Sequence, residues 1–74
     1  NVRHLQFFCS AAAPFFPPSA APELHRTLNL LLHFGIAGSR LALDQDEVEG
    51  RQTLNAAKKM LGEVWIQFCR NYTD

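Results

Sequence analysis

The pattern of apolar positions predicts a long amphipathic helix over about residues 20–43, within the leucine-rich segment 19–43. Its main row follows the alternating three- and four-residue spacing that places side chains on one helical face. That row consists of Leu24, Leu28, Leu31, Gly35, Gly38 and Ala42. Further apolar residues lie beside the row, so this helix must be covered on more than one side.

A second amphipathic helix is predicted over about residues 45–72. Its apolar row has the same kind of spacing and consists of Leu54, Ala57, Leu61, Val64, Phe68 and Tyr72. Charged and amide side chains occupy the opposite side, as expected for a helix with one buried face. The acidic segment 44–50 marks the junction between the two helices. Asp44, followed three residues later by Glu47, predicts a capping box at the start of the second helix.

The first 18 residues are rich in phenylalanine and proline. Three prolines between positions 14 and 18 exclude a helix interior there and favour an extended backbone. The segment also contains Phe7, Phe8, Phe15 and Phe16. These rings would make an aggregation-prone patch if they were all exposed together. We therefore predict an extended arm over residues 1–18 that lies against the helices or against a neighbouring subunit.

These elements predict an all-α fold, a two-helix antiparallel hairpin preceded by the extended arm. Residues 1–18 form the arm and residues 19–74 the hairpin, together one domain. A chain of 74 residues buries only about 60% of its unfolded surface, so its core is marginal. Its apolar content of 47% and its net charge of zero favour self-association. We expect two hairpins to form a four-helix bundle as a homodimer.

The candidate interface residues are the large apolar side chains of the arm and of the two helical rows. They are Phe7, Phe8, Phe15, Phe16, Leu28, Leu31, Phe34, Leu61, Trp65 and Phe68. Large aromatic side chains dominate the energetics of cores and interfaces. We therefore expect Trp65 and Phe68 to anchor the core or the dimer interface rather than to stack on nucleic-acid bases.

The sequence contains no motif that indicates an enzyme. It has no glycine-rich phosphate loop, no serine elbow, no His-Glu-x-x-His and no Cys-x-x-Cys. His25, Asn29 and His33 share a helical stripe. However, histidines eight residues apart lie about 12 Å apart along a helix axis, too far for one metal ion. We predict no catalytic residue, no cofactor and no metal site.

The charge balance limits the kinds of partner that the chain binds. Seven basic residues match seven acidic residues, which argues against a nucleic-acid-binding surface. No apolar run reaches the roughly 18 residues needed to span a bilayer. The expected partners are therefore a second copy of the chain and an unidentified protein.

The function predicted from these features is that of a small non-enzymatic interaction or regulatory module. It acts through the surface of a helical bundle, as a homodimer. Two alternatives remain open. One is a small secreted or periplasmic protein in which a Cys9–Cys69 disulfide ties the arm to the second helix. The other is a carrier of an apolar ligand, held between the arm phenylalanines and the bundle.

The order of short motifs between residues 7 and 69 resembles a family of short, uncharacterised proteins found mainly in pseudomonads. The motifs are a Phe-Phe-x-Cys-like arm (Phe7, Phe8 and Cys9 here) before a proline-containing helix start, a Leu-Leu stretch that ends in Leu41-Ala42-Leu43-Asp44, an acidic turn with Arg51, and Leu61-Gly62-Glu63 in an alanine-rich helix. The resemblance implies a bacterial, cytoplasmic helical hairpin with no assigned activity. It contributes no site residues.

Overall fold

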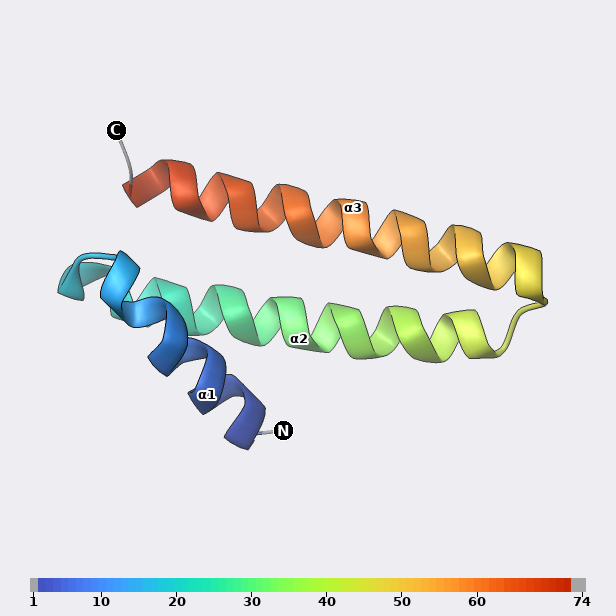
Figure 1. Cartoon of the computed structure of the whole chain (residues 1–74), viewed down its shortest axis with the longest axis horizontal. Coiled ribbons are helices and arrows are strands. Elements are labelled where there is room, and N and C mark those ends of the chain that lie inside the picture. The colour runs from blue at the N-terminus through green and yellow to red at the C-terminus, as the bar shows by residue number, and fades with distance from the viewer. Residues whose placement is uncertain (1, 73–74) are drawn as a thin grey trace.

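The computed structural model describes residues 2–72, which form three α-helices and no strand. The helices are α1 (Val2–Ala12), α2 (Ala21–Leu43) and α3 (Glu47–Tyr72). Two 3-10 segments, η1 (Ala13–Phe15) and η2 (Pro18–Ala20), join α1 to α2. Helices α2 and α3 lie antiparallel side by side, and α1 packs beside the N-terminal half of α2 (Figure 1). The all-α class is confirmed, and the two long helices overlap the ranges expected from periodicity.

The predicted extended arm is wrong, because residues 2–12 form a helix. The inner side of α1 is a row at spacings of four and three residues: Leu5 is buried, and Cys9 and Ala12 are half-buried. The local alternation around Phe7 resembles a strand and conceals this longer period. The prolines begin only at Pro14, so they exclude a helix after α1 and not within it.

Small residues allow α2 and α3 to approach closely. A Cβ atom added to Gly38 would lie 3.1 Å from the Cβ atom of Ala57 on α3. A Cβ atom added to Gly50 would lie 2.7 Å from the carbonyl oxygen of Ala42, a distance that real Cβ atoms essentially never show. The buried Gly50 therefore marks direct backbone contact between α3 and the end of α2.

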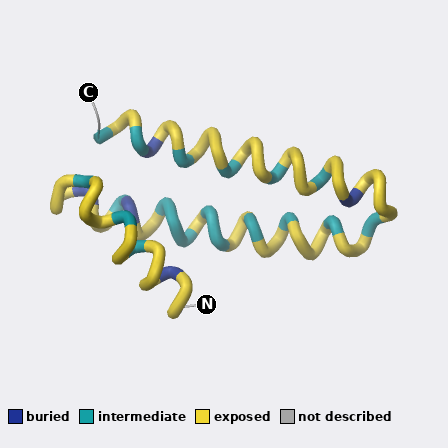
Figure 2. Tube along the Cα trace, viewed as in Figure 1, coloured by how far each residue is buried: buried dark blue, intermediate teal, exposed yellow. Residues whose placement is uncertain are grey.

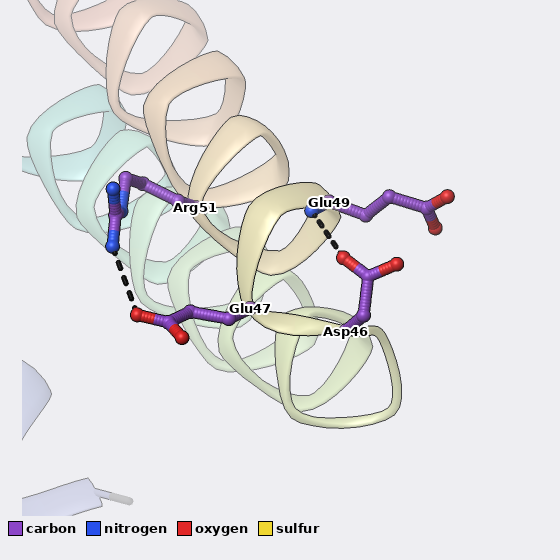
Figure 3. A network of polar contacts seen from close by, with 4 residues as sticks. All are labelled: Asp46, Glu47, Glu49 and Arg51. Carbon is purple, nitrogen blue, oxygen red and sulfur yellow. Dashed lines mark hydrogen bonds and ion pairs between the residues drawn. The ribbon is translucent and has the colours of Figure 1, made fainter.

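The turn between α2 and α3 places the helix cap on Asp46 and not on Asp44. The Glu49 N–H donates to Asp46 Oδ1 at 2.8 Å, as an N-cap residue requires (Figure 3). Asp44 instead ends α2, where its own N–H bonds back to carbonyl groups of that helix. Because α3 begins only at Glu47, Glu47 cannot be the third residue after the cap. It forms an ion pair with Arg51 at 3.1 Å.

The three helices lie side by side in one layer when the molecule is viewed down its shortest axis (Figure 1). The Cα atoms extend over 44 × 28 × 14 Å. The buried apolar residues are Leu5, Ala20, Leu24 and Phe68, and exposed positions follow all three helices (Figure 2). Stable domains contain two or more packed layers. The layer that would cover α2 and α3 is therefore not supplied by residues 2–72.

Candidate functional site

An apolar groove runs between α2 and α3 near the middle of the hairpin. Its volume is about 100 Å³, and only apolar side chains line it. They are Leu30, Leu31 and Phe34 from α2 and Met60, Leu61 and Val64 from α3. Leu31 and Leu61 are half-buried, whereas the other four side chains are exposed. Each helix thus contributes a pair of exposed side chains four residues apart, which lie on the same helical face.

The structure brings part of the predicted interface set into this groove. Leu31, Phe34 and Leu61 line it, and Leu28 is half-buried one turn before Leu31 on α2. Leu30, Met60 and Val64 line it too but were not among the predicted interface residues. Leu30 precedes Phe34 by four residues, and Met60 precedes Val64 by four residues. This helical spacing is the feature of the sequence that could have indicated them. The interface role of all these residues stays a prediction.

A second group of predicted residues forms an aromatic cluster at the open end of the hairpin. Phe16, from the segment between η1 and η2, lies edge-on against three rings of α3. The ring centroids are 5.9 Å apart for Trp65, 5.0 Å for Phe68 and 6.3 Å for Tyr72. Trp65 also stacks on Phe68, which is only 4% exposed. Phe68 is therefore a core residue of the single chain.

A polar contact closes the same end of the hairpin. The Tyr72 hydroxyl at the end of α3 donates a hydrogen bond to Glu23 Oε2 in the first turn of α2. This hydrogen bond, with burial and the charge of Glu23, raises the pKa of Tyr72, and the nearby Arg26 opposes that rise. Sequence reasoning missed this pair, since the two residues are 49 positions apart.

The remaining predicted residues lie on the outside of the N-terminal part. Phe7 and Phe8 pack edge to face with a centroid distance of 5.6 Å, and both are exposed. Phe15 is 80% exposed. These rings do not join the groove or the aromatic cluster within the chain, in contrast to the predicted arm that covers the helices.

The structure gives no chemistry of bond making or metal binding to this surface. In the part of the chain that is described, no group of three or more His, Cys, Asp and Glu side chains could hold a metal ion. The Cys9 thiol is free, so the Cys9–Cys69 disulfide of the secreted alternative is not formed. None of the helices between residues 2 and 72 has the length and hydrophobicity needed to cross a membrane.

The geometry is that of an all-helical layer with an uncovered apolar face, and a comparison with protein families identifies it. A family model described as "Tetracyclin repressor-like, C-terminal domain" matches residues 1–66. The chain belongs to this family. Comparisons with curated proteins and with solved structures found no match.

Membership in the TetR-like C-terminal domain family corrects the resemblance drawn from short motifs. The resemblance to short pseudomonad proteins is wrong, because the family match covers residues 1–66, including every motif on which the resemblance was based up to Leu61-Gly62-Glu63.

Membership in the family also indicates functional roles that the residues alone do not indicate. TetR-like C-terminal domains are non-enzymatic, so the prediction that the chain is not an enzyme is confirmed. In regulators, such domains mediate dimerisation and ligand binding.

Proposed function

We propose that this TetR-like C-terminal domain is the dimerisation and ligand-responsive part of a regulator, and that it dimerises through the groove between α2 and α3. The observation that carries the proposal is the one-layer architecture with an apolar face. Leu30 and Phe34 of α2 and Met60 and Val64 of α3 expose their side chains on either side of that groove.

The exposed area agrees with a missing partner layer. The chain exposes 5798 Å². A folded monomer of 8.3 kDa exposes roughly 4,600 Å² by the usual scaling of area with mass. The excess of roughly 1,200 Å² exceeds the ~800 Å² that each partner buries in an interface of standard size. A second copy therefore supplies both the missing layer and the missing burial.

In a dimer with a twofold axis, the groove of one subunit packs against the same groove of the other subunit. In a closed dimer the same patch is used by both subunits, so it must complement itself. The groove has no charged lining residue, so two copies meet without burying an unpaired charge. Two α2–α3 hairpins packed in this way form a four-helix bundle. A cytoplasmic location and binding to an unidentified protein partner are part of this proposal.

The test compares two substitutions on the same helix. Met60 lines the groove and is 53% exposed, whereas Ile66 is 52% exposed and is not among the groove residues. Light scattering should give the wild-type chain a mass near twice 8.3 kDa. Met60→Glu should shift the population to monomer or unfolded chain, because the dimer would bury an unpaired carboxylate. Ile66→Glu should leave the dimer intact.

Two results contradict the proposal. One is a wild-type chain that is a folded monomer at every concentration tested, with the helix content retained in circular dichroism. The other is a dimer that Ile66→Glu dissociates and Met60→Glu does not, because the interface would then lie on a different face of α3.

A further inference from the structure

In the segment between α1 and α2, one aromatic side chain packs on α3. Among residues 13–20, Phe16 is half-buried and Ala20 is buried, and the others are exposed. Its ring lies edge-on against Trp65, Phe68 and Tyr72, at centroid distances of 5.9, 5.0 and 6.3 Å. We call the space that this ring fills, between those three rings of α3, the Phe16 seat.

The backbone of the same segment contributes little to holding Phe16 in its seat. The Phe16 N–H donates to the Ala13 carbonyl at 3.2 Å, and the Ala20 N–H donates to the Pro17 carbonyl at 2.9 Å. Both bonds remain inside the segment, and its prolines have no N–H to donate. In addition, Leu5 is the only buried residue among residues 3–12 of α1. The ring contacts of Phe16 link this segment to α3.

We propose that the Phe16 seat is a binding site for a small, neutral, planar aromatic ligand, and that Phe16 is a plug which the ligand displaces. The inference rests on the ligand-responsive role proposed above and names the site and the ligand class for it. When the ligand enters, Phe16 leaves the α3 rings, and the segment that joins α1 to α2 loses its aromatic contact with α3.

The ligand class follows from the chemistry of the seat. Aromatic rings have negative faces and positive edges, and pairs prefer edge-to-face or offset contacts. All three contacts of Phe16 are of the edge type, so another flat ring reproduces them. Phe68 is only 4% exposed, so the base of the Phe16 seat is shielded from water. The hydroxyl of Tyr72 already donates its hydrogen bond to Glu23, so it is not available as a donor to a ligand in the seat.

A plug makes a quantitative prediction about affinity. When a site is open for only a fraction of the time, the apparent affinity is lowered by that fraction. Removing Phe16 opens the seat permanently and leaves an apolar cavity, and apolar cavities in proteins bind small aromatic molecules. Phe16→Ala should therefore bind a single-ring ligand more tightly than the wild type. Phe15→Ala is the matched control, since the neighbouring Phe15 is 80% exposed.

The experiment is a titration of the full chain with p-cresol, followed by the NMR signal of the indole N–H. The chain contains one tryptophan, so this signal reports on Trp65 alone. The wild type should show a saturable shift, Phe16→Ala a dissociation constant lower by about tenfold or more, and Phe15→Ala the wild-type value. 4-Methylcyclohexanol, similar in size but not aromatic, should bind more weakly than p-cresol to every variant.

Several outcomes overturn the inference. One is a folded Phe16→Ala chain that binds p-cresol no more tightly than the wild type. Another is an equal gain in Phe15→Ala, which would indicate binding outside the seat. Equal binding of the two probes would remove the aromatic preference.

If Phe16→Ala does not fold, Phe16→Leu and the wild type decide the question. Leucine keeps apolar volume but fills the seat without a ring, so a smaller gain in the same direction is expected. Absence of saturable binding in both chains overturns the inference. The titration follows the NMR signal of Trp65, whereas the dimerisation test measures molecular mass. A negative result in one experiment therefore does not decide the outcome of the other.

Discussion

The two ends of the α2–α3 hairpin are closed by different physical means. At the turn, the backbones touch, and Gly50 lies so close to Ala42 that no Cβ atom fits between them. At the open end, side chains fill the space: Phe68 lies under Phe16, and Tyr72 bonds to Glu23. Figure 1 shows the two helices further apart at the open end than at the turn.

The difference separates an end closed by backbone contact from an end closed by side chains. Backbone contact through glycine tolerates almost no change, since an added atom meets a carbonyl oxygen and not a flexible side chain. Aromatic packing contributes more burial but can be exchanged for other rings of similar shape. On the proposal above, a bound molecule would alter the spacing of the helices at the open end rather than at the turn.

Truncation of Phe68 should have the largest effect on stability. Phe68→Ala removes the buried ring that contacts Phe16, Trp65 and Tyr72. Replacing a buried phenylalanine by alanine costs about 3–5 kcal/mol, because burial is lost and a cavity remains. Urea unfolding at one fixed protein concentration measures this change, since the stability of a dimer depends on concentration. Phe7→Ala, at a 67% exposed position, should change the free energy of unfolding by less than about 0.5 kcal/mol. Equal losses in the two variants would contradict the aromatic closure.

The Gly50 contact at the turn should show the next largest effect. Gly50→Ala forces a methyl group to within 2.7 Å of the Ala42 oxygen, so the helices must separate. Overpacking of this kind costs about 1–3 kcal/mol. Gly62→Ala is the matched control on the same helix, because nothing lies within 4 Å of its added Cβ atom. That control should gain up to about 1 kcal/mol from helix propensity. Thermal unfolding of the two variants therefore gives opposite signs, and the same sign in both would contradict the close approach.

The cap of α3 should contribute the smallest of these effects. Asp46→Ala removes the acceptor of the Glu49 N–H and should cost about 1 kcal/mol. Asp44→Ala is the control that separates the observed cap from the one predicted by sequence, and it should cost less than Asp46→Ala. Circular dichroism with urea titration compares the two variants. A larger loss for Asp44→Ala would restore the capping box that the sequence predicts and contradict the observed turn.

Much of the hairpin could be predicted because its signals are local and repeated. The row from Leu24 to Ala42 recurs over five helical intervals, so single exceptions do not hide the period. Gly38 belongs to this row, and it lies against Ala57 of α3. The cap was displaced by two residues because Asp44 and Asp46 both offer the required side chain, and only the path of the turn selects between them.

The N-terminal part shows where a sequence pattern misleads. The row of Leu5, Cys9 and Ala12 covers only two intervals, and the bulky neighbours of Leu5 imitate the alternation of a strand. The prolines that follow Ala13 favour an extended backbone, and that prediction was applied to the residues before them as well. Which of the phenylalanines is inside depends on the position of α3, and residue type alone cannot separate Phe15 from Phe16.

The sequence by itself determined the all-α class, the two long helices and the surplus of apolar surface, because periodicity and composition act along the chain. Tertiary structure decided which apolar residues meet. It joined Leu30 and Phe34 to Met60 and Val64, placed Phe16 on the α3 rings and brought Tyr72 to Glu23. These contacts link positions far apart in sequence, and they depend on the spacing and antiparallel register of two helices, which no local pattern encodes.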